Sequence, residues 1–295
     1  MKYSVVISTY NRQGDLEKCV GSVLNQTELP DEVMIFDDGT LSKNFVSPLL
    51  KSIRDGGIKG TYYKKNNSRS TEVKGDASSR MLGLRMARND VVLTLDDDII
   101  LDEGSCSALI RVWEDEENNP KLMGVGMVIT NLGQKWSWLN GLFNAFFGIR
   151  TKYKWDITSV GCQTWDDNIK KREKGYYLHG GVASYRKKLA LTIGFKELRG
   201  KDVDFCSRAK RAGYHFIIEP RARAMHMRSS LGRPSEYRAG FKEGRGRWII
   251  YNEIPNKSLG HTLLFCWSNF GWILRQVLFL RPTRAIGIIV GFFRR

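Results

Sequence analysis

The sequence predicts an α/β protein with an open, Rossmann-like and mostly parallel sheet flanked by helices, and with a helical appendage at the C-terminal end. Three observations support this prediction. Short apolar runs alternate with amphipathic helical patterns over the first hundred residues. Three of these runs end in polar clusters, and the chain beyond residue 230 has helical periodicity without strand signals. Strands that alternate with helices of this length favour parallel βαβ units.

The first half of the chain supplies most of the strand and helix pairs. The expected strands are short runs rich in Val and Ile, and the expected helices carry apolar residues at spacings of three and four. The clearest helical stripe runs from Leu16 to Leu24. We expect strands at 3–8, 32–36, 61–64 and 91–95, and helices at 15–26, 76–88 and 103–118.

The second half has a less regular pattern. We expect a strand at 123–130, an irregular aromatic-rich stretch at 131–180, a strand at 182–185, a helix at 202–212 and a strand at 215–219 that Pro220 closes. Helices should follow at 235–253, 258–280 and 283–293. Because no linker or repeat interrupts the chain, we expect one α/β domain over 1–230 and a basic, amphipathic helical region over 231–295.

The composition is that of a folded globular protein of 295 residues, with 42% hydrophobic residues. Five scattered cysteines form no Cys-x-x-Cys pair, which indicates a reducing compartment and excludes a disulfide scaffold or zinc ribbon. The first residues lead directly into a strand pattern, and no apolar run reaches the ~18 residues of a membrane span. We therefore expect a cytoplasmic protein.

Polar clusters follow three of the expected strands, at 9–11, 37–39 and 96–98. In open parallel sheets, ligands bind outside the carboxyl ends of the strands, so these clusters should share one crevice. The third cluster is three consecutive Asp residues, whose mutual repulsion is costly unless a cation neutralises it. Hard oxygen ligands suit Mg²⁺ or Mn²⁺ bound to a ligand's phosphates. The alternative is an acidic turn that caps the next helix.

No phosphate-binding loop of the Walker type and no Gly-x-Gly-x-x-Gly fingerprint follows the first strand. Phosphate-loop hydrolases and the usual dinucleotide-binding enzymes are therefore disfavoured. The remaining possibility is a nucleotide-binding site that is formed by Asp and Asn side chains together with a divalent metal.

These segments resemble the family 2 glycosyltransferases, which are inverting enzymes with the GT-A fold. The first strand of that family is similar to Ser-Val-Val-Ile-Ser-Thr-Tyr-Asn at 4–11, and its second is similar to Val-Met-Ile-Phe-Asp-Asp-Gly-Thr at 33–40. Its Asp-x-Asp motif matches the end of Val-Leu-Thr-Leu-Asp-Asp-Asp at 92–98. The likeness is continuous over 3–115 and continues more weakly to about residue 230.

The resemblance implies a nucleotide-diphospho-sugar donor and a Mg²⁺ or Mn²⁺ ion. Asp38 would contact the base, Asp96 the ribose or donor sugar, and Asp98 the metal, with His226 as a further metal ligand or a merely structural residue. Arg80 lies in Ser-Arg-Met-Leu-Gly, which keeps the Arg and Gly of the family's Ala-Arg-Asn-x-Gly but has Met in place of Asn. The implied donor-site residues are Thr9, Tyr10, Asn11, Asp37, Asp38, Arg80, Asp96 and Asp97.

The resemblance also implies an acceptor side with a catalytic base. The family's base is the Asp of a Glu-Asp pair at the start of a helix, and Asp202 takes that place here, with Lys201 instead of the usual Glu. Asp202 could also be only the N-cap of that helix, and Asp204 is the alternative base or an acceptor contact. Gly180 and Gly181 would line the acceptor pocket or would simply form a hairpin turn.

The last 75 residues, 221–295, hold 14 Lys and Arg against three Glu and no Asp, which is +11 of the total charge of +16. Amphipathic helices with aromatic residues on one face and Arg on the other lie in the headgroup layer of membranes. Trp267 and Phe270 would then enter the lipid, and Arg275 and Arg281 would meet lipid phosphates. We therefore expect a peripheral enzyme on the cytoplasmic face of a membrane, with a glycan or lipid-linked acceptor. The alternative is that these helices pack on the α/β domain or on a second subunit.

The sequence-based hypothesis is an inverting, metal-dependent glycosyltransferase of polysaccharide, glycolipid or lipid-linked glycan synthesis. A sugar-phosphate nucleotidyltransferase is an alternative, but it needs a Gly-rich basic loop after the first strand, which 9–14 does not provide. A nucleic-acid-binding protein is suggested by the pI of about 9.7. No recognition motif for nucleic acid is present, so we expect no such partner.

Overall fold

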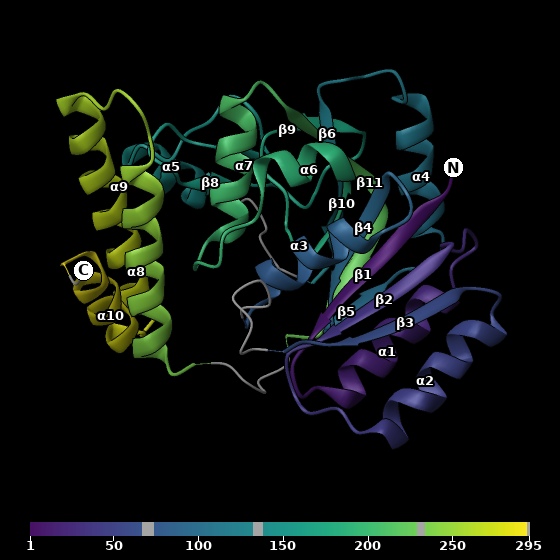
Figure 1. Cartoon of the computed structure of the whole chain (residues 1–295). Helices are drawn as coiled ribbons and strands as arrows, with labels where there is room; N and C mark the ends of the chain where they lie inside the picture. Colours follow the sequence, from purple (N-terminus) through teal and green to yellow (C-terminus); the bar gives the residue numbers. More distant parts are fainter. Residues whose placement is uncertain (67–73, 132–137, 229–233, 294–295) are drawn as a thin grey trace.

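The computed structural model describes residues 1–66, 74–131, 138–228 and 234–293. They form a mixed sheet with helices on both faces, and a separate group of C-terminal helices beside it (Figure 1). The strand order is β3-β2-β1-β4-β10-β6-β11-β5, and β9 pairs with β11. The strands are β1 Tyr3–Thr9, β2 Glu32–Asp37, β3 Lys59–Lys64, β4 Val91–Asp96, β5 Ile99–Leu101, β6 Leu122–Ile129, β9 Glu173–Gly175, β10 Val182–Arg186 and β11 His215–His226.

The first four strands are parallel to one another and form the predicted half of the sheet. Strand β1 is buried along its whole length because helices cover both faces. Val5 and Ile7 face the core beneath helices α1 (Gln13–Leu24), α2 (Lys43–Asp55) and α4 (Ser105–Asp115). Val6 faces the other core, beneath helices α3 (Asp76–Met86), α6 (Lys187–Ile193) and α7 (Lys201–Arg211). This two-sided cover explains the uninterrupted apolar strands of the sequence.

The other half of the sheet is mixed because β10 lies antiparallel between β4 and β6. Strand β11 pairs parallel with β6 and antiparallel with β5. The prediction that Pro220 ends this strand was wrong. A register shift between Glu219 and Arg223 accommodates the proline, and the strand continues to His226. This extension pairs His226 with Ile99, which immediately follows the three Asp residues.

Helices α2 and α6 were missed in the sequence. Helix α2 contains Pro48, which normally interrupts a helical pattern, yet Val46, Leu49 and Ile53 form a buried stripe. Its N-cap is Ser42, whose hydroxyl accepts a hydrogen bond from the Phe45 amide. Tertiary burial therefore outweighed the local cost of the proline.

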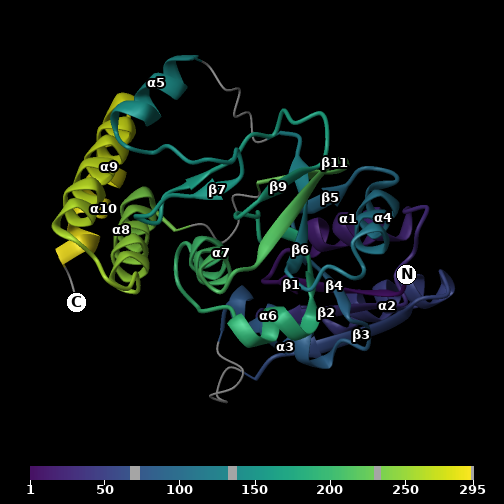
Figure 2. The same ribbon diagram turned by 90° about the horizontal axis from the view of Figure 1, so that it is seen from above.

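The C-terminal region is helical as expected, with α8 Glu236–Asn252, α9 Leu259–Leu278 and α10 Pro282–Phe293. Helices α8 and α10 approach closely because Gly240 and Gly244 face the backbone of α10, where a Cβ would lie 2.2 and 2.1 Å from carbonyl oxygens. Helix α5 (Trp138–Phe146) packs against the middle of α9, where the Trp267 indole donates to the Phe146 carbonyl. The small hairpin of β7 (Asp156–Ile157) and β8 (Gln163–Thr164) lies between these helices and the sheet (Figure 2). The helices therefore pack on the chain before residue 230.

Candidate functional site

The polar clusters of β1, β2 and β4 meet at one edge of the sheet, as predicted. The register places Thr9 beside Asp37 and Ser8 beside Asp96. An open crevice with about 1490 Å³ of unfilled space lies there. The predicted site residues that line it are Thr9, Tyr10, Asp38, Asp96, Asp97, Asp98 and His226.

Asp97 and Asp98 lie at the floor of the crevice. The Thr9 hydroxyl donates to Asp97 at 2.8 Å, and the guanidinium of Arg12 lies 3.0 Å from Asp97 and 3.4 Å from Asp98. Burial raises the pKa of Asp97 to about 6, although the contacts from Thr9 and Arg12 oppose this shift. On the other side, Asp98 Oδ1 lies 3.1 Å from His226 Nε2. The extension of β11 past Pro220 makes this contact possible.

Asp98 and His226 are the pair that could hold a divalent metal. In the described part of the chain, no group of three or more His, Cys, Asp or Glu side chains is arranged to do so. Mg²⁺ commonly takes only one or two protein ligands and completes its coordination with water and substrate phosphates. Mn²⁺ prefers similar oxygen ligands. One carboxylate and one imidazole at the edge of a large crevice fit a metal of this kind.

Arg80 connects the donor side of the crevice to the acceptor side. Its side chain is 3% exposed and donates to Asp96 at 3.0 Å, to Asp76 at 2.8 Å and to Asp202 at 2.8 Å. Burial alone would lower the pKa of Arg80, but the three carboxylates outweigh burial and raise it. Arg80 is therefore a permanent cation that sets the positions of Asp96 and Asp202 relative to each other.

Asp202 is the second residue of α7 and is not its N-cap, because Gly200 takes that position. Its side chain keeps 27% of its surface exposed. Gly180 and Gly181 precede β10 and lie directly against the carboxylates. A Cβ on Gly180 would be 1.9 Å from Asp202 Oδ1, and a Cβ on Gly181 would be 2.5 Å from Asp96 Oδ2. Only glycine allows this close approach.

Seven predicted residues lie outside the lining of the crevice. Four of them, Arg80, Asp202, Gly180 and Gly181, contact one another or Asp96 just behind it, and the other three have structural contacts. Asp37 is fully buried and accepts hydrogen bonds from the Gly39 amide and the Tyr62 hydroxyl, so it holds the turn after β2. Asn11 accepts from the Thr40 amide at 2.7 Å and braces the same turn. Asp204 is 1% exposed and pairs with Arg208 at 2.5 Å.

Several cations in or next to the crevice were not identified from the sequence. Lys65 lies behind the lining, with Nζ 2.8 Å from Asp38 and 3.1 Å from the Ser79 hydroxyl. Lys74 lines the crevice, 3.8 Å above the ring of Tyr10. Arg12 also lines it, and its position directly after the first polar cluster could have indicated this.

The C-terminal helices and the α7 region add further charges to the crevice. Helix α10 contributes the cation Arg284 and helix α8 the carboxylate of Glu236, for which the sequence carried no signal. Arg199 and Lys201 are the cations from the α7 region.

Comparison with curated proteins gives partial matches. A Campylobacter jejuni GalNAc(5)-diNAcBac-PP-undecaprenol beta-1,3-glucosyltransferase is 34% identical over 112 residues, which is 37% of this chain and 34% of that protein. The poly(ribitol-phosphate) beta-N-acetylglucosaminyltransferase TarP of Staphylococcus aureus is 31% identical over 125 residues, 41% of this chain and 35% of TarP. The matched part thus spans about a third of each relative.

Solved structures share the fold over nearly the whole chain. The mannosyltransferase PcManGT from Pyrobaculum calidifontis, solved with GDP-Man and Mn²⁺, has a TM-score of 0.60 at 14% identity and covers 94% of this chain and 75% of its own. S. aureus TarS 1-349 in complex with UDP-GlcNAc has a TM-score of 0.56 at 15% identity, with 93% and 73% covered. At these identities the likeness concerns the fold, which is the GT-A fold.

The family model that matches is Glycosyl transferase family 2, over residues 4–190. This range is more than half of the chain and includes all three polar clusters, Arg80 and the two glycines before β10. The chain therefore belongs to glycosyltransferase family 2.

Proposed function

We propose that the protein transfers a sugar, with inversion, from a nucleotide-diphospho-sugar to an acceptor hydroxyl with the help of Mg²⁺ or Mn²⁺. One observation carries this proposal. Arg80 contacts both Asp96 and the candidate base Asp202, and Asp96 lines the same crevice as Asp98 and His226. This arrangement would bring a nucleotide-sugar site and a proton acceptor together.

The roles of the residues follow from their positions. Asp38 and Lys65 would contact the nucleotide, and Asp96 would contact the ribose or donor sugar. Asp202 would accept the proton of the attacking hydroxyl, as an inverting transfer requires a base on the acceptor side. Gly180 and Gly181 would let the acceptor sugar approach the backbone.

Charge is the second part of the mechanism. When bound at Asp98 and His226, the metal would supply Lewis-acid stabilisation of the departing diphosphate. The cations of the crevice can share that task, since guanidinium and ammonium groups pair well with phosphate oxygens. Arg12, 3.0 Å from Asp97, lines the crevice together with Lys201 and Arg284.

The donor can be identified by thermal shift with Mn²⁺ and UDP-, GDP- or dTDP-sugars. A ligand that binds the native state raises its melting temperature by mass action. We expect one nucleotide class to raise it, and the product of transfer to have the opposite anomeric configuration by NMR. Retention of configuration, or no response to any donor, would contradict the proposal.

Gly180→Ala should lower transfer about hundredfold, because a new Cβ would displace the Asp202 carboxylate and misplaced catalytic groups cost rates of that order. The measurement is initial rate at saturating donor. Gly21→Ala is the matched control, since no atom lies within 4 Å of a Cβ at that helical position. If the Gly180→Ala enzyme transferred sugar at the unmodified rate, the present position of Asp202 would not be required for catalysis.

We further propose that helices α5, α9 and α10 lie on an anionic membrane surface. No helix in the described ranges is long and apolar enough to cross a membrane. Large apolar side chains are nevertheless exposed on these helices, and the surrounding region is strongly basic. The exposed residues are Leu139, Leu142, Phe146, Leu259, Leu263, Trp267, Phe270, Val277, Leu278, Ile286, Ile289 and Phe293.

Other features are compatible with a membrane-bound acceptor on the cytoplasmic side. The name of the C. jejuni relative includes a PP-undecaprenol acceptor, which supports a lipid-linked acceptor for this chain as well. The five cysteines are free thiols, as a reducing compartment permits.

Leu259→Glu combined with Leu263→Glu should weaken binding to phosphatidylglycerol vesicles more than tenfold. Both side chains are more than half exposed on α9, and each would lose about 1.5–3 kcal/mol of apolar burial in lipid. Co-sedimentation measures the effect. Leu29→Glu with Met86→Glu, at exposed apolar positions elsewhere, should bind as the unmodified protein does. If both double variants bound vesicles as well as the unmodified protein, this membrane face would be ruled out. If Leu259→Glu with Leu263→Glu instead converted a dimer into a monomer, the face would be assigned to contact with a second subunit.

A further inference from the structure

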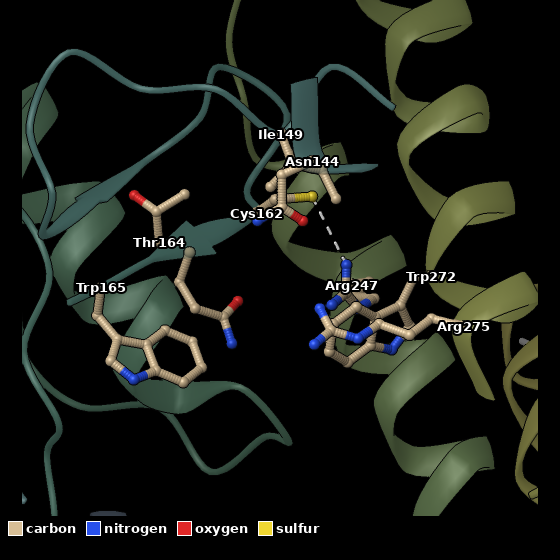
Figure 3. Close-up of a pocket in the computed structure, with 9 residues that line it drawn as sticks. Asn144, Ile149, Cys162, Thr164, Trp165, Arg247, Trp272 and Arg275 are labelled. Carbon is tan, nitrogen blue, oxygen red and sulfur yellow. Dashed lines mark hydrogen bonds between the residues drawn. The ribbon is translucent and has the colours of Figure 1, made fainter. Parts of the chain in front are cut away.

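A second pocket lies away from the crevice, between the β7–β8 hairpin and helices α5, α8 and α9. Its unfilled space, which includes open solvent at its mouth, is about 520 Å³. Arg247, Trp272 and Arg275 gather on one side of it, and Thr164 and Trp165 lie across from them (Figure 3). Cys162 lies next to Arg247, which donates to its Sγ at 3.6 Å. Among the described residues no Asp or Glu lines the pocket, and the amides of Asn144 and Gln163 complete a lining that is rich in hydrogen-bond donors.

The positive charge of this pocket is incompletely compensated. Arg247 is 12% exposed on its side chain, and its carboxylate neighbour Glu243, at 3.7 Å, pairs more closely with Arg284 at 3.0 Å. Arg275 has no carboxylate within 4.0 Å among the described residues, and burial lowers its pKa. Both guanidiniums lie over the ring of Trp272, at 4.6 and 6.0 Å from its centroid.

Arg275 was expected to meet lipid headgroups, and the structure places it in the lining of this pocket, with its guanidinium 6.0 Å from the ring centroid of Trp272 and 5.6 Å from that of Phe279. The indole N–H of Trp272 is buried and has no hydrogen-bond partner among the described residues. Two guanidiniums and an unpaired N–H form a donor set that suits an anion with several acceptor oxygens.

A series of residue contacts runs from the wall of the pocket to the candidate base. The ring of Trp165, which forms one wall, lies 5.3 Å from the ring of His179. His179 directly precedes Gly180, which touches Asp202. The pocket therefore lies close to the candidate base.

We propose that this pocket binds a phosphate group of the acceptor. That the phosphate belongs to the acceptor rests on the proposed transferase function, but phosphate binding by the pocket does not. The planar forks of Arg247 and Arg275 supply paired hydrogen bonds to phosphate oxygens, and Trp272 holds both forks in place. The phosphate can belong to a soluble phosphate ester or to a lipid headgroup at the neighbouring membrane face.

The test measures phosphate binding without donor and without metal, using sn-glycerol 3-phosphate in solution and phosphatidylcholine vesicles that contain phosphatidic acid. Arg275→Gln should weaken binding about tenfold or more in at least one arm, because one charged fork is lost. Arg275→Lys keeps the charge but loses the planar guanidinium, so its affinity for phosphate should lie between those of Arg275→Gln and the unmodified protein. This second variant keeps the test valid if Arg275→Gln does not fold. The arm that responds identifies the source of the phosphate.

Arg245→Gln is the matched control, because Arg245 lies exposed on α8 and does not line the pocket. It should bind both probes as the unmodified protein does. The proposal would be overturned if Arg275→Gln bound both probes with the affinity of the unmodified protein. It would also be overturned if Arg245→Gln lost as much affinity as Arg275→Gln. The donor-induced thermal shift should be the same in all four proteins, so a failure of the proposed transferase function would appear there and not in phosphate binding.

Discussion

Asp202→Asn is expected to lower sugar transfer by about 10²–10⁴-fold, because the amide keeps the shape of the carboxylate but cannot accept the acceptor's proton. Arg80 would retain Asp76 and Asp96 as partners, so the fold and the donor site should survive. Donor affinity, measured by calorimetry with Mn²⁺, should therefore stay near its original value while kcat falls.

Asp204→Asn is the informative comparison for this experiment. Asp204 is buried and paired with Arg208, which also donates to the Gly194 carbonyl at 2.7 Å. Its substitution should lower the melting temperature, because Arg208 would lose its buried carboxylate partner. The folded enzyme should still transfer sugar. If instead Asp204→Asn abolished kcat and Asp202→Asn did not, the base would be Asp204.

The second large effect is expected at Asp98. Asp98→Asn should reduce metal-dependent transfer about hundredfold or more, because a bound divalent metal contributes several kcal/mol of stabilisation to the departing diphosphate. Mn²⁺ binding in the presence of the nucleoside diphosphate, followed by electron paramagnetic resonance, should weaken in parallel. Treatment of the unmodified enzyme with a chelator should produce the same loss.

Asp102→Asn serves as the control, because Asp102 is half-exposed, pairs with Arg223 at 3.6 Å and does not line the crevice. It should leave transfer and Mn²⁺ binding unchanged. Full activity after chelation, or normal Mn²⁺ binding by Asp98→Asn, would refute the metal site and leave the cations of the crevice to stabilise the diphosphate alone.

Much of the fold was predictable because local patterns and tertiary burial agree over the first hundred residues. Strands β1, β2 and β4 are mostly apolar since both faces of the sheet are covered, and a cluster of polar residues marks the carboxyl end of each. Parallel pairing then brings these ends together without further information. For the same reason the grouping of Thr9, Asp38 and Asp96 could be predicted before any coordinates.

Elements whose local sequence conflicts with their surroundings could not be predicted in this way. Helix α2 contains Pro48, and β11 continues past Pro220 through a register shift. In both cases, burial and pairing with distant residues outweigh a local signal that normally ends an element. The contact between His226 and Asp98 depends directly on that shift.

The sequence alone thus determined the α/β class and the carboxylates at the strand ends, because each depends on patterns within a few neighbouring residues. Its resemblance to a known family indicated Asp202 as the candidate base. Only the tertiary structure decided that Arg80 joins Asp96 to Asp202, that Arg284 reaches the crevice and that Arg275 turns into a second pocket. These contacts join segments far apart in the chain, such as Arg80 and Asp202, which are 122 residues apart. Their geometry depends on how helices pack against a sheet, which no local pattern records.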